Sequence, residues 1–147
     1  MSLLKNNILR EVGALSRCIQ TVSDTRFRKY GLQKGQFIFI TRICENEGIN
    51  LIDLTQMLNV DKATTTKAVQ KLIEAGFIEK KHDSTDKRMW NLYPKQKLIE
   101  LYPLIITEEN KNIEICFETL SEDEKLLAYQ CIKKMRDSLY KYSRSAR

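Results

Sequence analysis

Side chains that could contact a polyanion are concentrated in two neighbouring stretches of the 147-residue chain. In the first, residues 62–75 have the spacing of a helix whose polar side carries small residues and flexible hydrogen-bond donors. This side consists of Lys62, Ala63, Thr64, Thr66, Lys67, Gln70 and Lys71. Such groups can approach phosphates and the edges of bases in a major groove. The only acid on this side is Glu74, at the far end of the helix.

The second stretch is a predicted hairpin whose turn is rich in basic residues. Lys81, Lys87 and Arg88 lie on or beside the polar turn at residues 83–87, together with Lys80 and His82. An arginine at the tip of a hairpin can enter a narrow minor groove, where the negative potential is enhanced. Either stretch alone could be an ordinary solvated surface, but the two side by side favour contact with nucleic acid.

Other chemistry has little support in the residue pattern. The four cysteines, Cys18, Cys44, Cys116 and Cys131, are scattered, and the single histidine is distant from them, so no metal site is expected. The five glycines form no phosphate-binding loop, and no residue is placed as a base for a nucleophilic cysteine. We therefore expect neither an enzyme nor a cofactor.

The overall composition fits a soluble globular protein with an anionic partner. Hydrophobic residues make up 42% of the chain and charged residues 30%, and 25 Lys and Arg against 19 Asp and Glu give a net charge of +6. No signal peptide or membrane span is visible, so we expect a cytoplasmic protein that does not bind membranes. Its thiols should be reduced and mostly buried.

Two capped helices and a hairpin would position the basic residues. Asn50 and Asp61 are each suited to cap a helix, and they predict helices over about 50–58 and 62–75 joined by a tight turn. This is the arrangement of a helix-turn-helix. Strands are expected over 77–82 and 88–93.

Longer helices should flank this centre. We expect one over the first thirty residues, ended by Gly31, and another over about 33–46. A third should run from 95 to about 120, with Pro103 kinking or breaking it, and a fourth should follow a capping box formed by Ser121 and Glu124. The first and last helices carry narrow apolar stripes suited to packing against other helices. The predicted fold class is mainly α with a small β-hairpin wing, a winged helix-turn-helix flanked by long terminal helices.

The sequence resembles the MarR family of winged-helix regulators. The stretch 60–72 resembles that family's recognition helix, 75–80 its entry into the wing, and Asp86-Lys87-Arg88 its Asp-x-Arg wing motif. The order of elements matches over nearly the whole chain. The resemblance implies a single domain, 1–147, with a DNA-binding lobe over about 32–94 and dimerisation helices over about 1–31 and 95–147.

The resemblance also implies a homodimeric repressor that binds an inverted-repeat operator in double-stranded DNA. Thr64, Thr66 and Lys67 would face the major groove, Arg88 would be the wing-tip arginine, and Asp86 would hold the turn. The residues implied to form the dimer are Ile8, Val12, Leu15, Ile132, Met135 and Leu139.

Two positions depart from the family pattern. Lysine stands at position 67, where the family often has arginine, and a lysine cannot contact guanine with two parallel hydrogen bonds. Residues 94–98 replace the family's Leu-Thr-x-x-Gly after the wing, so the junction between strand and helix must be built differently.

The resemblance also bears on regulation. Many members of the family respond to small phenolic or lipophilic effectors, and Tyr30, Phe37, Phe39 and Tyr102 could line an effector pocket or be plain core. Some relatives sense oxidants through a cysteine in the first helix, but we expect Cys18 to be buried or inert. The alternatives are a redox-sensing regulator and a winged-helix protein-interaction module.

Overall fold

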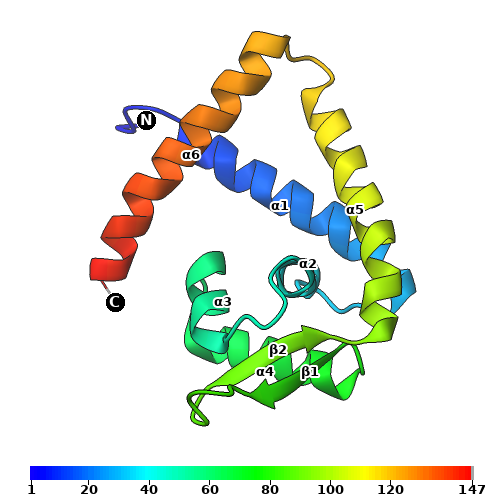
Figure 1. Cartoon of the computed structure of the whole chain (residues 1–147). Coiled ribbons are helices and arrows are strands. Elements are labelled where there is room, and N and C mark those ends of the chain that lie inside the picture. Colours follow the sequence, from blue (N-terminus) through cyan, green and yellow to red (C-terminus); the bar gives the residue numbers. More distant parts are fainter. Residues whose placement is uncertain (147) are drawn as a thin grey trace. The chain divides into compact units, whose positions relative to one another are not determined.

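The computed structural model describes residues 1–146 (Figure 1). The chain divides into two compact units, Met1–Glu109 and a second unit from Asn110 onward. The elements in chain order are α1 (Ile8–Phe27), the short 3-10 helix η1 (Arg28–Tyr30), α2 (Phe37–Glu45), α3 (Leu51–Leu58), α4 (Lys62–Glu74), β1 (Ile78–His82), β2 (Trp90–Pro94), α5 (Gln96–Phe117) and α6 (Glu122–Ser145). The predicted winged helix-turn-helix fold class is confirmed.

The caps predicted for the two central helices are present. The Asn50 side chain accepts a hydrogen bond from the backbone N–H of Asp53 at 2.8 Å, and Asp61 accepts one from Thr64 at 2.7 Å. Between the helices, Asn59 adopts a left-handed conformation with φ of 50°. Asparagine tolerates this conformation better than most residues, so a turn of three residues suffices to join α3 to α4.

The wing, residues 78–94, is an antiparallel hairpin in which His82 pairs with Trp90 and Ile78 with Pro94. Its second strand also bonds to the segment between α2 and α3, because the Gly48 N–H donates to the Leu92 carbonyl at 2.8 Å and the Leu92 N–H donates to Ile49 at 2.9 Å. The hairpin is thereby anchored along one edge to the helix-turn-helix.

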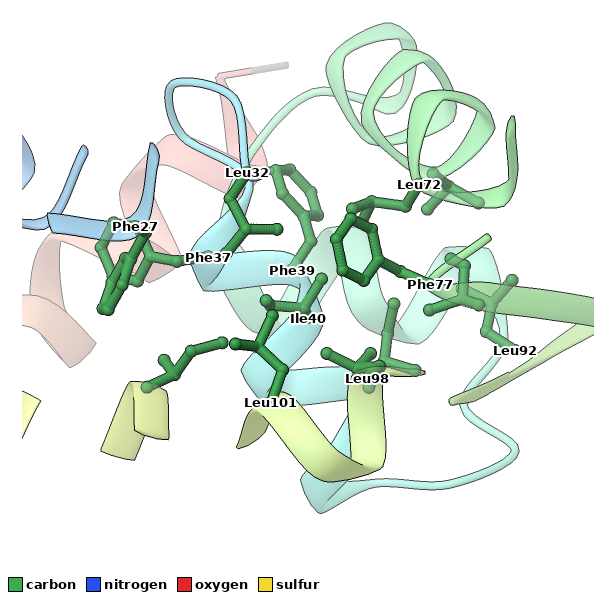
Figure 2. Packing of buried hydrophobic residues seen from close by; sticks show 14 of the residues in the cluster. Phe27, Leu32, Phe37, Phe39, Ile40, Leu72, Phe77, Leu92, Leu98 and Leu101 are labelled. Atoms are coloured by element: carbon green, nitrogen blue, oxygen red, sulfur yellow. The ribbon is translucent and has the colours of Figure 1, made fainter. Parts of the chain in front are cut away.

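One hydrophobic core joins α2, α4, the wing and the start of α5. Ile40, Leu72, Leu92 and Leu98 are fully buried, and Phe77 is 1% exposed. Figure 2 shows these side chains gathered in a single cluster. Because α4 and the wing share this core, their outward faces are held in a fixed relation.

Two predicted boundaries are wrong. Helix α2 begins at Phe37 and not near 33, because Gly35 has a φ of 77° and the Gln36 side chain accepts from the Gln33 N–H, which makes a turn. The second strand begins at Trp90 and not at 88, because Met89 donates its N–H to the Asp86 carbonyl within the turn. Of the two alternatives predicted at Pro103, a kink or a break, the break is excluded because α5 continues through this residue.

The second unit contains the end of α5 and helix α6. The predicted capping box is confirmed, since Ser121 and Glu124 each accept a hydrogen bond from the other's backbone N–H, at 3.2 and 3.0 Å. No residue of α6 is buried. Within residues 1–146, none of the helices has the length and apolar character needed to span a membrane.

Candidate nucleic-acid interface

Helix α4 has a buried side and a basic, exposed side. Thr65, Val69 and Leu72 are buried against the core. The opposite side, called here the α4 face, is exposed at all seven predicted positions: Lys62, Ala63, Thr64, Thr66, Lys67, Gln70 and Lys71. The sequence therefore predicted the orientation of this helix correctly. A helix that shows small and basic residues to solvent, with no acid until its last residue, has the character of a surface that meets phosphates.

Two polar groups of the α4 face already have partners. The Thr64 hydroxyl donates to the Asp61 carboxylate at 2.9 Å, so its proton belongs to the helix cap. The Gln70 side-chain amide donates to Glu74 at 3.1 Å. Donation to a base from Thr64 would require this cap to open. Thr66, Lys67 and Lys71 are the better candidates for donors.

The junction between α4 and the wing is short and well bonded. The Phe77 N–H donates to the Leu72 carbonyl at 3.0 Å, and the Lys95 N–H donates to the Phe77 carbonyl at 2.9 Å. The Lys97 ammonium donates to the Ala75 carbonyl at 3.0 Å and lies 4.2 Å from the centre of the Phe77 ring. These contacts form the unusual strand-to-helix junction, and they couple α4, the wing and α5.

The turn of the wing is organised by Asp83. One carboxylate oxygen accepts from the Thr85 N–H at 2.8 Å, the Thr85 hydroxyl at 2.6 Å and the Asp86 N–H at 3.0 Å. The other accepts from the Asn91 amide at 2.9 Å. These hydrogen bonds hold the pKa of Asp83 well below its ordinary value, and the one from the Thr85 side chain has the largest effect. The turn is therefore ordered by a charged acceptor.

Asp86 and Arg88, the two ends of the Asp-x-Arg motif, are paired in the turn of the wing. The Arg88 guanidinium donates to both carboxylate oxygens of Asp86, at 3.0 and 3.2 Å, and the Arg88 N–H donates to one of them at 3.1 Å. The guanidinium also lowers the pKa of Asp86. The Arg88 side chain is 91% exposed, whereas that of Asp86 is 35% exposed. A half-buried acid thus orients an exposed cation at the turn.

The base of the wing carries further cations around aromatic rings. Lys80 lies 4.7 Å from the centre of the Trp90 ring, and Lys81 lies 5.0 Å from that of Tyr93. Lys81 also pairs with Glu79 at 3.3 Å. Lys87 is exposed in the turn. Together with Arg88, these lysines make the exposed surface of the wing basic, beside the equally basic α4 face.

The predicted dimerisation residues lie on exposed faces of the terminal helices. Ile8, Leu15, Ile132 and Leu139 are 43–58% exposed. Val12 and Met135 are half-buried within the chain. The two sets belong to different units, α1 in the first and α6 in the second.

The four aromatic residues predicted for an effector pocket lie in different surroundings. Phe37 is buried against Phe27, with ring centres 5.3 Å apart, and Tyr30 packs at the edge of the core. Tyr102 donates to Glu45 at 2.9 Å and lines a small cavity with Cys44. Phe39 lines a separate cavity of about 450 Å³.

The cavity beside Phe39 adjoins the α4 face. Its lining residues come from α1, α2, the segment between them, the turn before α4 and α4 itself: Gln20, Gln33, Lys34, Gly35, Gln36, Ile38, Phe39, Val60, Thr64, Lys67, Ala68 and Lys71. Lys67 and Lys71 thus belong both to this cavity and to the candidate interface. The sequence pattern did not reveal the cavity, because residues 33–36 were expected to be helical.

The expectation of mostly buried thiols is wrong. Cys18, Cys116 and Cys131 are exposed and Cys44 is half-buried. The three exposed thiols lie on faces of α1, α5 and α6 that nothing within their own unit covers. Burial and the nearby Glu45 and Glu47 raise the pKa of Cys44 to about 11.

The sequence reasoning also missed Asp83 and the role of His82 in the turn. An Asp followed two residues later by Thr is typical of an Asx-turn, so Asp83 could have been recognised. The contact of His82 with the turn depends on how the strands pair and leaves no local sequence signal.

Known proteins resemble this chain over its whole length. The MarR family model matches residues 32–89. The helix-turn-helix transcriptional regulator YybA of Bacillus subtilis, itself uncharacterized, is 32% identical over 91% of this chain and 89% of its own length. The structure of a MarR protein from Peptoclostridium difficile is 50% identical, covers 100% of this chain and 96% of its own, and superimposes with a TM-score of 0.96.

A relative has also been solved with DNA. This is a MarR family transcriptional regulator from Listeria monocytogenes in complex with a 26mer DNA. It is 33% identical, covers 94% of this chain and 91% of its own, and has a TM-score of 0.90. The agreement in sequence and fold extends through the helix-turn-helix, the wing and the long helices, and this chain belongs to the MarR family of transcriptional regulators.

Proposed function

We propose that the chain is a repressor that binds an inverted-repeat operator in double-stranded DNA as a homodimer, and that a small effector releases it. The observation that carries this proposal is the exposed α4 face, basic and free of acids up to Glu74, beside a wing whose turn presents Arg88. In this proposal α4 lies in the major groove, with Thr66 and Lys67 toward the bases, and Arg88 lies in the adjacent minor groove. The Listeria relative that was solved with a 26mer DNA supports DNA as the partner.

The proposed homodimer rests on the apolar stripes of the terminal helices. Ile8, Leu15, Ile132 and Leu139 are exposed in the single chain, and burying such side chains in a second copy would be favourable. A symmetric dimer presents two α4 faces. It should therefore select two half-sites related by a two-fold axis and spaced by about one helical turn of DNA.

The proposed effector site is the cavity lined by Phe39, Lys67 and Lys71. A cavity lined by the Phe39 ring and these two lysines suits a phenolic compound that carries a negative charge. An effector there would contact the same lysines that we assign to DNA. Its binding would therefore compete directly with the operator.

Selection of bound duplexes from a random library tests the proposal. We expect enrichment of an inverted repeat, and we expect a Lys67→Ala variant to lose the enrichment while retaining the fold. A protein-interaction module that merely uses a basic surface would enrich no symmetric sequence, and that result would contradict the proposal.

A further inference from the structure

We propose that His82 is a positioning residue that fixes the tip of the wing, so that Arg88 is presented to the minor groove in a single geometry. The inference rests on the proposed function for its consequence on DNA. The claim that His82 orders the tip of the wing concerns the free protein alone. His82 does not need to touch DNA for this role.

A hydrogen bond joins the imidazole to the backbone on the far side of the turn. The His82 Nδ1 atom lies 2.7 Å from the carbonyl oxygen of Lys87. A carbonyl oxygen only accepts, so Nδ1 carries the proton in this contact. The residue that the imidazole holds is directly before Arg88 in the chain.

The imidazole ring is itself held from the opposite strand. His82 and Trp90 are cross-strand partners, and their rings stack with centres 3.6 Å apart and planes at 30°. Lys80, two residues earlier on the same strand, lies 4.7 Å from the centre of the same indole. The stacking therefore restrains the rotamer of His82 independently of the hydrogen bond to Lys87.

The hydrogen bond fills a gap in the turn. Asp83 holds Thr85 and Asp86, and the Asp86 side chain holds Arg88. The bond from His82 holds the carbonyl of Lys87, between these two. Without this bond, the Lys87 carbonyl, which belongs to the peptide group before Arg88, would no longer accept a hydrogen bond from the His82 side chain. The Asp86–Arg88 pair would then move with the peptide.

Two substitutions separate the hydrogen bond from the stacking. In His82→Asn the side-chain amide nitrogen can take the place of Nδ1 and donate to Lys87, but the stacked ring is lost. In His82→Phe the ring can stack on Trp90, but no donor remains. We expect the asparagine variant to resemble the wild type and the phenylalanine variant to lose the order of the tip.

Backbone order parameters of Lys87 and Arg88 from NMR relaxation test the positioning in the free protein. We expect them to fall in His82→Phe and to be retained in His82→Asn, with unchanged thermal unfolding in both. Unchanged order parameters in His82→Phe would overturn the inference, whatever the protein binds.

Titration with an operator duplex tests the consequence. We expect His82→Phe to weaken binding by up to about fivefold per wing, the lower end for losing backbone order at one residue and no more than the removal of Arg88 itself, and His82→Asn to bind like the wild type. In an Arg88→Ala background the His82→Phe change should have no further effect. A full additional loss in that background would overturn the inference, because His82 would then act independently of Arg88. A wild type that prefers no duplex would instead refute the proposed function, and the order parameters would still decide the role of His82.

Discussion

Replacement of Arg88 by alanine removes the cation that the wing presents, with little reason to change the fold. The Arg88 side chain is 91% exposed and contacts Asp86 through its guanidinium. Asp86 keeps its hydrogen bond from the backbone N–H of residue 88 after the substitution. We therefore expect the unfolding midpoint and the dimer to be unchanged and the whole effect to fall on DNA binding.

The size of the effect follows from one cation in each of two wings. A loss of about 1 kcal/mol per wing, at the lower end for an arginine at DNA, gives about 2 kcal/mol for the dimer and about 30-fold weaker binding at 50 mM salt. Each missing phosphate neutralisation lowers the slope of log affinity against log salt by about 0.9, so two lower it by about 1.8. Over a fourfold increase in salt, the ratio of wild-type to Arg88→Ala affinity should therefore fall by about 12-fold, to about two- or threefold at 200 mM.

Fluorescence anisotropy titrations of an operator duplex at several salt concentrations measure both quantities. Arg136→Ala is a matched control, because Arg136 also pairs with a neighbouring aspartate, Asp137 at 2.8 Å, but lies on α6 and outside the candidate interface. Wild-type affinity together with a wild-type salt slope for Arg88→Ala would refute the reasoning and remove the wing from the mechanism.

Four further substitutions or conditions test other parts of the account. Leu139→Glu should dissociate the dimer in sedimentation velocity, whereas Ser138→Glu on the neighbouring face should not; a dimeric Leu139→Glu would exclude α6 from the interface. Leu72→Ala opens a cavity in the fully buried core, and we expect urea denaturation to show a loss of about 3 kcal/mol; a loss below about 1 kcal/mol would contradict the packing. Hydrogen bonding lowers the pKa of Asp83 in the folded protein, so the Asp83 carboxylate should order the wing fully above about pH 4 and lose this effect only as the pH falls below that value. NMR chemical shifts of the wing that change near pH 6 would contradict this prediction. Because the pKa of Cys44 is about 11 against an ordinary 9.0, its thiolate fraction at pH 8 should be about 100-fold lower than that of an ordinary thiol. Cys44 should therefore react slowest of the four cysteines with a thiol reagent, and Cys44→Ser should abolish the slowest phase of that reaction.

Features that depend on a few consecutive residues were predictable from the sequence. The caps at Asn50, Asp61 and Ser121 are bonds between a side chain and a backbone N–H three residues later, so the residue types suffice to place them. The orientation of α4 followed from the spacing of its apolar residues, which are buried as expected.

Features that depend on contacts between distant segments were not predictable. The start of α2 shifted because Gly35 takes a positive φ and donates to Asp24 on α1. The exposure of Cys18 depends on which face of α1 the rest of the chain leaves uncovered. The bond from His82 to Lys87 exists only because the two strands pair in one particular register.

Affinity for the DNA upstream of the chain's own gene, measured beside a scrambled duplex of equal length and at several salt concentrations, tests the central claim most directly. We expect a strong preference for the upstream duplex and a steep loss of affinity with salt, as roughly 6–10 phosphate contacts would require. Equal and weak binding to both duplexes would contradict the assignment of the α4 face and the wing as an operator-reading surface.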